Sequence, residues 1–238
     1  PLKKLEEYQT FEEFYDGYKA LLDYYLDLSV KAQYHSYEVM NQHVSFLFTS
    51  LLTDDCIARG KALLDGGVRY LGGTNETYGN INTSDSLWVI RDLVFNQKKY
   101  TLRQLNDAML ANFNGYEALR KDCLNCDKYG NDLETADTMA NDLYEFVAKG
   151  VRNRGIAIGM QYFLIVISNN QLNTEWGNRT AASPDGRLSC MYMNPANNPQ
   201  GGANKSGPTA MLNSLAKFDA KYHGGSVQNI KFSPSMFN

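Results

Sequence analysis

Two cysteines separated by two residues are the most obvious candidates in this chain for metal binding or redox chemistry. They are Cys123 and Cys126. A structural zinc site needs four ligands, usually from two such pairs, but the sequence has one pair, and His35, His43 and His223 are all distant from it. A thioredoxin-like pair opens a helix after a strand, whereas this pair is predicted to follow a helix. We therefore interpret both thiols as structural or incidental and expect no metal site.

Glycine pairs and aspartates offer two further possibilities, and neither has the required pattern. Gly66-Gly67 and Gly72-Gly73 could cradle a phosphate, but they match neither the GxxxxGK[ST] nor the GxGxxG spacing. Asp54-Asp55 and Asp65 could form a carboxylate site. Aspartates before an apolar helix more commonly cap it or occupy its first turn, where the helix dipole favours negative charge. We expect a plain loop and helix-start residues.

A tight turn carries the third group of candidates. Ser183-Pro-Asp-Gly186 has proline at the second position, which fixes φ, and glycine at the fourth. Arg179, Thr180, Ser183, Asp185 and Arg187 surround it. In one interpretation, Asp185 and an ion pair with Arg187 merely hold the turn. In the other, the turn faces a substrate pocket, where Thr180 or Ser183 forms a hydrogen bond and Arg187 neutralises an anionic group. The substrate-binding candidates are therefore Thr180, Ser183 and Arg187.

Helices dominate the elements that must position these residues. Thr10-Phe-Glu-Glu13 and Thr101-Leu-Arg-Gln104 are capping boxes that predict helix starts. Gly150 predicts a helix stop. The predicted elements of the first two thirds are helices over 10–28 and 30–52, a glycine-rich loop over 60–79 with an extended piece at 68–71, a helix from Ser84 or Asp85 to Phe95, a helix after Thr101, a helix from Thr135 to Gly150 with Met139, Leu143, Phe146 and Val147 inward, and a buried strand or strand pair over 156–167.

The last third predicts one more helix and one more strand. Gly207-Pro208 opens the helix, because proline is tolerated at the first helical position. Gly224-Gly225 is expected to end it, and residues 227–232 are expected to form a strand. The residues predicted to share the apolar face of the helix are Met211, Leu212, Leu215 and Phe218.

Composition and charge are those of an ordinary globular protein. The 238 residues are 43% hydrophobic and 21% charged, with a net charge of −3, which gives no reason to expect nucleic acid or an anionic membrane as a partner. The longest apolar run, 156–167, is about half of the roughly 20 residues that a membrane span needs. With no signal peptide, we expect a cytoplasmic protein with reduced thiols. We predict one α/β unit over 1–238, with parallel strands linked by helices and a helical lead-in over 1–52.

Several segments resemble, in the same order, the glycyl radical enzymes, the family of pyruvate formate-lyase, glycerol dehydratase and choline trimethylamine-lyase. Asp55-Cys-Ile-Ala-Arg-Gly-Lys61 is similar to the family's Asp-Cys-Ile-Glu-Arg-Gly-Lys, and Gly66-Gly-Val-Arg-Tyr70 to its Gly-Gly-Ala-Arg-Tyr. The other matching segments are Ser84-Asp-Ser-Leu87 with Leu93-Val-Phe95, Ala111-Asn-Phe-Asn-Gly-Tyr116, Lys128-Tyr-Gly-Asn-Asp132, and the turn, helix and strand between Thr180 and Phe237. Together they cover nearly all of the chain from Asp55 onward.

The resemblance implies part of a ten-stranded α/β barrel that surrounds two loops. In the family, a cysteine on one loop becomes a thiyl radical and a glycine on the other stores the radical. The thiyl abstracts a hydrogen atom from a small substrate, and elimination or C–C cleavage follows. A partner enzyme that uses S-adenosylmethionine and an iron–sulfur cluster installs the glycyl radical. The amino-acid sequences of these segments are most similar to those of the dehydratase branch of the family.

Neither radical motif occurs in these residues. The family's Gly-Cys-x-Glu motif precedes the region that matches Asp55 onward, its Arg-Val-Ala-Gly-Tyr motif follows the point that matches Asn238, and Cys56 matches a different family position. We expect a middle-to-late barrel segment with no catalytic residue and no bound cofactor, inactive alone. Its expected partners are the activating enzyme and either the rest of the barrel or a second copy. The alternative is a non-catalytic binding or assembly module that kept the scaffold; an unrelated α/β binding protein is a third hypothesis.

Overall fold

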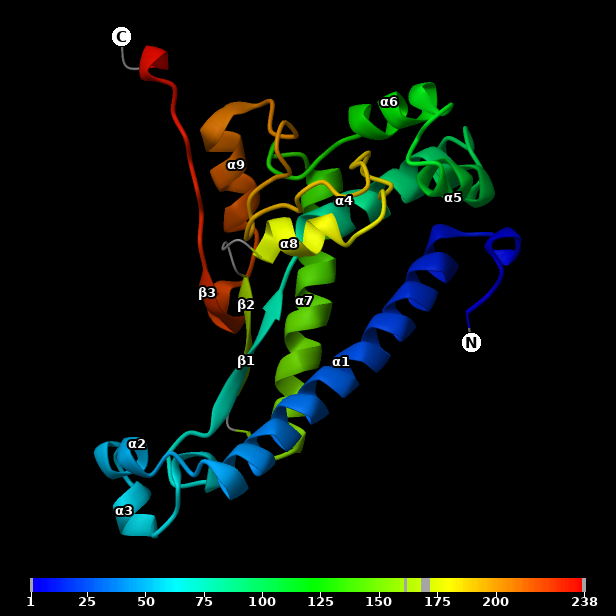
Figure 1. The fold of residues 1–238 in the computed structure, drawn as a ribbon. Helices are drawn as coiled ribbons and strands as arrows, with labels where there is room; N and C mark the ends of the chain where they lie inside the picture. Colours follow the sequence, from blue (N-terminus) through cyan, green and yellow to red (C-terminus); the bar gives the residue numbers. More distant parts are fainter. Residues whose placement is uncertain (1, 161, 168–171, 237–238) are drawn as a thin grey trace.

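A sheet of three parallel strands runs through the computed structural model, which describes residues 2–160, 162–167 and 172–236 (Figure 1). The strands are β1 (Gly72–Thr77), β2 (Tyr162–Ile167) and β3 (His223–Ser226), in the order β1-β2-β3. β1 pairs with β2 from Gly72 opposite Tyr162 to Thr77 opposite Ile167, whereas the pairing of β2 with β3 shifts register between Ile165 and Val166. Parallel neighbours require long crossovers, and the helices supply them, as the sequence predicts.

The helices precede and connect the strands. α1 and α7 lie side by side along the length of the molecule, while α2 and α3 form a separate lobe at one end (Figure 1). Before β1 come α1 (Phe11–His43), α2 (Leu47–Leu52) and α3 (Cys56–Arg59). The first crossover contains α4 (Asn80–Val89), a π-helix (Ile90–Asn96), α5 (Leu102–Leu110), α6 (Glu117–Asn125) and α7 (Glu134–Ala157). The second contains α8 (Leu172–Asn178), α9 (Gly207–Ala216) and a 3-10 turn (Ala220–Tyr222). Further 3-10 turns are Leu5–Glu7, Leu63–Asp65 and Pro234–Met236.

The start of α1 is predicted correctly, but its end is not. Thr10 caps the helix by accepting a hydrogen bond from the Glu13 backbone N–H at 3.2 Å. The Glu13 carboxylate accepts from the Gln9 backbone N–H at 3.1 Å and not from Thr10, so the predicted box is only half formed. The helix also continues past residue 28 to His43, because Leu26 and Val30 pack into one continuous buried stripe.

The predicted stop at Gly150 is wrong, and helix packing gives the reason. α7 passes through Gly150 and ends at Ala157. A Cβ at Gly150 would lie 3.0 Å from Leu26 Cδ1, so the glycine lets α1 approach α7 closely. Arg154 reinforces the contact one turn later by donating to Asp23 at 2.5 Å. The segment predicted as a buried strand, 156–167, therefore starts within the end of α7, and β2 begins only at Tyr162. The predicted burial of the β2 side chains lies outside what the structure describes.

The strand predicted at 68–71 lies instead at 72–77, because the earlier residues are tied to α3. Arg69 Nε donates to Asp55 Oδ2 at 2.8 Å. Asp55 occupies the N-cap position of α3, as predicted, but its side chain makes no capping hydrogen bond. The helix expected to start at Ser84 or Asp85 begins earlier, at Asn80, so both of these residues lie inside it and are buried. The capping box at Thr101 is confirmed.

The C-terminal helix is predicted correctly at its start, whereas the segment after it is not. α9 begins at Gly207 with proline in its first turn, and Met211 is buried. Leu212 is 47% exposed, because it lies about 100° around the helix from Met211. The two glycines at 224 and 225 belong to β3, and residues 227–232 form no strand. Asn198 pairs with the backbone there, exchanging hydrogen bonds with the N–H and C=O of Asn229.

The buried apolar side chains form two clusters that share a boundary. One gathers around α4, the π-helix, α5 and α6, and the other around the middle of α1, α7 and α9. Leu22 and Val147 pack against both clusters, so the two are continuous. Within the described part of the chain, no helix combines the length and apolar character that crossing a membrane requires.

Candidate functional site

The turn at 183–186 has the predicted geometry. Gly186 N–H donates to the Ser183 carbonyl at 3.0 Å, and Ser183 N–H donates to the Arg187 carbonyl at 3.0 Å. Gly186 has φ +94°, a left-handed conformation that favours glycine. A Cβ there would also lie 2.7 Å from Leu124 Cδ2. Glycine is therefore needed both for the turn and for its contact with α6.

Asp185 anchors the turn to the first half of α4. Asp185 is 4% exposed. Its carboxylate accepts hydrogen bonds from Asn82 Nδ2 at 2.6 Å, from Ser183 Oγ at 2.6 Å and from the Arg187 backbone N–H at 3.2 Å. Its own N–H donates to Ser86 Oγ at 3.2 Å. Charge-assisted hydrogen bonds of this kind are stronger than neutral ones. The turn and α4, about a hundred residues apart in sequence, are thus held as one piece.

Arg187 stabilises the turn in a different way from the one predicted. Its guanidinium donates to Ser183 Oγ at 3.2 Å, to the Met191 carbonyl at 2.8 Å and to the carbonyls of Ala181 and Leu188. No ion pair joins Arg187 to Asp185 in the described part of the chain, because the carboxylate is occupied by Asn82 and Ser183. Burial lowers the pKa of Arg187 from its ordinary value. The predicted ion pair is therefore wrong, although both side chains do hold the turn.

Thr180 precedes the turn and is attached to α8. Its hydroxyl donates to the Trp176 carbonyl at 2.7 Å. The structure thus brings Ser183 and Arg187 into direct contact, while Thr180 makes its bond on the α8 side. None of the three belongs to the residues that line the cavity described next.

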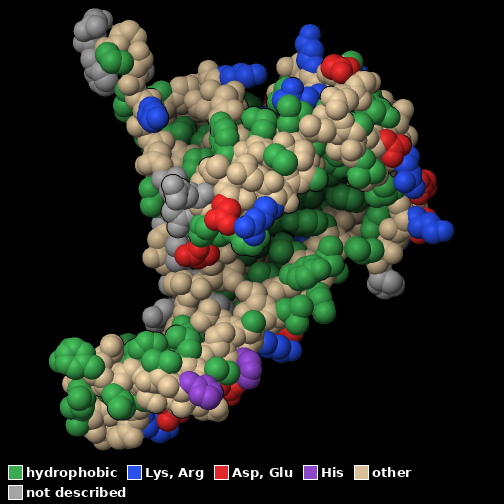
Figure 2. Space-filling view, viewed as in Figure 1, with side chains coloured by type: hydrophobic (Ala, Val, Ile, Leu, Met, Phe, Trp, Pro, Cys, Tyr) green, Lys and Arg blue, Asp and Glu red, His purple; other side chains and the backbone are tan. Residues whose placement is uncertain are grey.

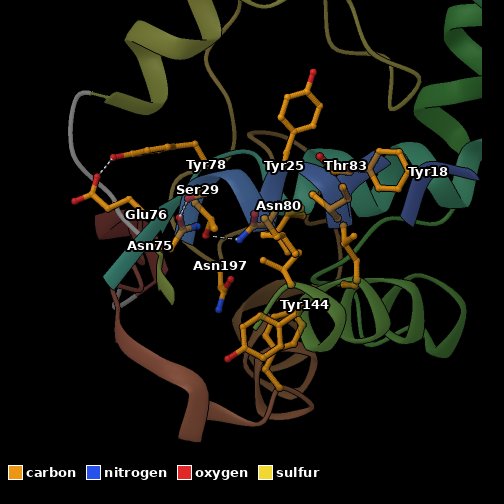
Figure 3. A pocket seen from close by; sticks show the side chains of 18 residues that line it. Tyr18, Tyr25, Ser29, Asn75, Glu76, Tyr78, Asn80, Thr83, Tyr144 and Asn197 are labelled. Atoms are coloured by element: carbon orange, nitrogen blue, oxygen red, sulfur yellow. Dashed lines mark hydrogen bonds between the residues drawn. The ribbon is translucent and has the colours of Figure 1, made fainter. Parts of the chain in front are cut away.

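A cavity of about 360 Å³ lies at the carboxyl end of β1, between α1, α4 and α7 (Figure 3). In parallel sheets, ligands commonly bind at the carboxyl ends of the strands. Apolar residues of α1, α4, α7 and the segment after α9 form one part of the lining, namely Leu22, Leu26, Ile81, Ala140, Leu143, Val147 and Phe218. Aromatic and polar residues form the rest, namely Tyr18, Tyr25, Ser29, Asn75, Glu76, Thr77, Tyr78, Asn80, Thr83, Tyr144 and Asn197.

Polar side chains from three elements meet in this cavity. Ser29 Oγ of α1 donates to Asn75 Oδ1 of β1 at 2.5 Å, and Asn80 Nδ2 of α4 donates to Thr77 Oγ1 at 2.9 Å. Ser29, Asn75 and Asn80 all line this cavity (Figure 3). Burial raises the pKa of Tyr18, so its phenol stays protonated and neutral. The arrangement can donate and accept hydrogen bonds but carries little charge.

Asp85 is one of four buried polar residues of α4, and the sequence patterns predict it only as a helix-start residue. Asp85 is 1% exposed, and its Oδ1 accepts the Tyr129 backbone N–H at 2.9 Å, while its Oδ2 has no partner among the described residues. Burial raises the pKa of Asp85 to about 8, which outweighs the opposing effect of Lys128. The run of polar residues at 82–86, inside a helix whose neighbours are apolar, was the signal that could have indicated a buried network.

Cys123 and Cys126 are free thiols that lie beside α4 and the turn, and they do not form a reactive site. Burial raises the pKa of Cys123 to about 12 and that of Cys126 to about 11. Lys128 Nζ donates to the backbone carbonyls of both cysteines, at 2.6 and 3.2 Å, so its charge is directed at the backbone. Protonated thiols are poor nucleophiles. Among the described residues, no cluster of His, Cys, Asp and Glu could hold a metal ion.

Two family models match the chain consecutively. The model described as "Pyruvate formate lyase-like" matches residues 1–172, and the model described as "Glycine radical" matches residues 193–238. Among curated relatives, a trans-4-hydroxy-L-proline dehydratase of Clostridioides difficile is 31% identical over 230 residues, which are 96% of this chain and 29% of that protein. A probable dehydratase of Escherichia coli is 30% identical, again over 96% of this chain and 29% of the relative.

Two solved structures share the fold. A structure from Roseburia inulinivorans concerned with 1,2-propanediol dehydration superposes with a TM-score of 0.91 at 30% identity, covering 98% of this chain and 30% of that one. The glycerol-bound B12-independent glycerol dehydratase of Clostridium butyricum superposes with a TM-score of 0.88 at 29% identity, covering 94% of this chain and 28% of that one. The chain thus spans less than a third of the length of the proteins it matches.

Proposed function

This chain belongs to the pyruvate formate lyase-like family of glycyl radical enzymes, and we propose that it forms the middle-to-late barrel segment of a lyase or dehydratase that acts on a small polar substrate. Its fold is part of the α/β barrel of these enzymes. The observation that best supports the proposal is the order of the matches. The two family models match residues 1–172 and 193–238 in turn, and the structure concerned with 1,2-propanediol dehydration covers 98% of the chain. The named relatives favour the dehydratase branch.

We further propose that these 238 residues are inactive alone. They contain neither a Gly-Cys-x-Glu nor an Arg-Val-Ala-Gly-Tyr motif, so neither radical residue is supplied by them. A glycyl radical, installed by an activating enzyme that uses S-adenosylmethionine and an iron–sulfur cluster, would provide the hydrogen-abstracting chemistry. The partners in this proposal are that enzyme, a small-molecule substrate and the remaining part of the barrel or a second copy.

The contribution of this chain is to build and hold part of the barrel wall. Asp185 fixes the turn to α4, and α4 follows directly from β1. We propose that Thr180, Ser183 and Arg187 border the substrate in the complete enzyme. Ser183 and Arg187 support this role by fixing the shape of the turn, since their polar groups already bond to protein atoms. We also propose that residues 1–238 act as one α/β unit and that the enzyme works in the cytoplasm.

Thr180→Val in the complete enzyme tests the substrate role of the turn. Valine keeps the size of the side chain and removes the hydroxyl. We expect KM to rise at least threefold, with little change in the thermal midpoint of unfolding. Thr138→Val is the matched control, because Thr138 is an exposed residue of α7 whose hydroxyl also bonds a residue four positions earlier. If both variants keep the wild-type KM, Thr180 does not bind substrate.

The coding sequence on both sides of this segment separates the enzyme from its alternative, a non-catalytic binding or assembly module. The lyase or dehydratase proposal requires a Gly-Cys-x-Glu motif upstream and an Arg-Val-Ala-Gly-Tyr motif downstream, in the same or an adjoining reading frame. The absence of both motifs from the locus would overturn the enzyme proposal and favour the module.

A further inference from the structure

Three helices and the end of a strand form most of the lining of the cavity at the carboxyl end of β1. α1 forms one side and α4 and α7 form the others, with the end of β1 between them. Figure 2 shows the molecule hollowed on this face, beside α1, with apolar side chains along the hollow. Its volume, about 360 Å³, is within the range of small-molecule sites. The described residues therefore form a hollow of the size that a small-molecule ligand needs.

One side of the cavity suits hydrocarbon. Leu22 and Leu26 of α1 face Leu143 and Val147 of α7, and Phe218 joins them. Leu26 and Leu143 are 5% and 4% exposed and belong to the two continuous apolar clusters. These side chains offer no hydrogen bonds, so an apolar group placed against them gains free energy by leaving water. A fully hydrated ligand would lose hydrogen bonds there.

The polar part of the lining retains unused hydrogen-bonding groups. Asn75 uses its Oδ1 to accept from Ser29, while its Nδ2 has no partner in the part of the chain that the structure describes. Asn80 uses its Nδ2 to donate to Thr77, and its Oδ1 is likewise without a described partner. A donor and an acceptor therefore remain in the lining of one cavity, on two half-buried residues (Figure 3). A hydroxyl or amide group can satisfy both, since each is donor and acceptor at once.

The charge of the lining restricts the ligand further. Glu76 is the only carboxylate among the eighteen lining residues, and it accepts a hydrogen bond from Tyr78. The lining contains no lysine, arginine or histidine. An anion would lose hydration on entry and find no cation to offset that cost. Carboxylates, phosphates and sulfonates are thus poor ligands for this site.

We propose that this cavity is a binding site for a small neutral molecule with hydroxyl or amide groups at one end and a hydrocarbon flank at the other. The site is separate from the turn that carries Thr180, Ser183 and Arg187. The proposal does not rest on radical chemistry, because it concerns binding by these 238 residues alone. It can therefore fail while the family function stands, or hold while the function fails.

A titration with 1,2-hexanediol tests the proposal. Its two hydroxyls match the Asn75 and Asn80 groups, and its butyl chain matches the leucine wall. Two-dimensional amide NMR spectra of the 238-residue chain are expected to show saturable shifts at both asparagines. Hexanoate, which has the same number of carbons and a carboxylate, is expected to bind at least tenfold more weakly. Absence of saturable shifts with the diol, or equal affinity for hexanoate, would overturn the proposal.

Variants locate the binding in the cavity. Asn75→Leu keeps the side-chain size and removes the amide, and we expect at least fivefold weaker binding of the diol. Tyr25→Ala removes part of the wall at a residue that is 59% exposed, so folding should tolerate it. Asn153→Leu is the control, because Asn153 is exposed on α7 and does not line the cavity. Unchanged affinity in both cavity variants, with folded spectra, would place the diol elsewhere and refute the site.

Discussion

Replacing Asp185 by alanine is expected to destabilise the chain strongly, because this carboxylate joins the turn to α4. Three donors lose their acceptor: Asn82 Nδ2, Ser183 Oγ and the Arg187 backbone N–H. A hydrogen bond to a charged group contributes about 1.5–3 kcal/mol, and a buried donor left without a partner costs about 1–3 kcal/mol.

Part of that loss can be recovered locally. Asn82 Nδ2 also donates to Gln200 Oε1 at 3.1 Å, and the Ser183 hydroxyl can rotate to another acceptor. The Arg187 N–H and one Asn82 N–H are left as the main losses. We therefore expect Asp185→Ala to lower the free energy of unfolding by about 3–5 kcal/mol. Asp185→Asn should cost about 2 kcal/mol, because its one amide oxygen can still accept from Ser183 and Arg187.

Urea unfolding followed by circular dichroism measures these differences. Asp54→Ala is the matched control, since Asp54 is an exposed aspartate, and we expect it to change stability by less than about 0.5 kcal/mol. The expected order of stability is Asp54→Ala, then Asp185→Asn, then Asp185→Ala. If Asp185→Ala is as stable as the control, the carboxylate does not anchor the turn to α4, and the proposed organisation of the barrel wall is wrong.

Gly186, the buried carboxyl of Asp85 and the cysteines each give a further prediction. Gly186→Ala should destabilise by about 2–4 kcal/mol in urea unfolding, since it adds a clash to the left-handed backbone; Gly202→Ala, at φ +82° with open space around it, should cost only about 1 kcal/mol, and equal costs would contradict the clash. The pKa of Asp85, raised to about 8 by burial, lies above its unfolded value, so its contribution to stability should be lost as the pH rises from about 4 to 8. Asp85→Asn should flatten that part of the stability profile, and an unchanged profile would exclude Asp85 as its source. Iodoacetamide at pH 8 should modify exposed Cys190 at least tenfold faster than Cys126, as measured by mass spectrometry, and equal rates would contradict the protonated state of Cys126.

Features that depend on local sequence were predictable. The turn at 183–186 follows from proline and glycine at fixed positions, and the helix start at Thr101 from a capping box that satisfies its own backbone groups. Both are set by residues within four positions of each other. The family resemblance likewise follows from short segments in a fixed order, and the two family models confirm it.

Features that depend on contacts between distant residues were not predictable from pattern alone. Gly150 suggests a helix stop, but the close approach of Leu26 gives it a place inside α7. Asp185 was expected to pair with neighbouring Arg187, and it binds Asn82, about a hundred residues earlier, instead. The cavity is a stronger example, since Ser29 and Asn75 meet there only after α1 packs beside β1. No spacing in the sequence indicates that contact.

Electron paramagnetic resonance after treatment with an activating enzyme and S-adenosylmethionine tests the central proposal most directly. Two samples should be compared under anaerobic conditions: the 238-residue chain, and the product of the extended reading frame. We predict a glycyl radical signal only in a polypeptide that also contains the Arg-Val-Ala-Gly-Tyr glycine. A glycyl radical on the 238 residues alone would contradict the proposal that they form only part of the barrel wall.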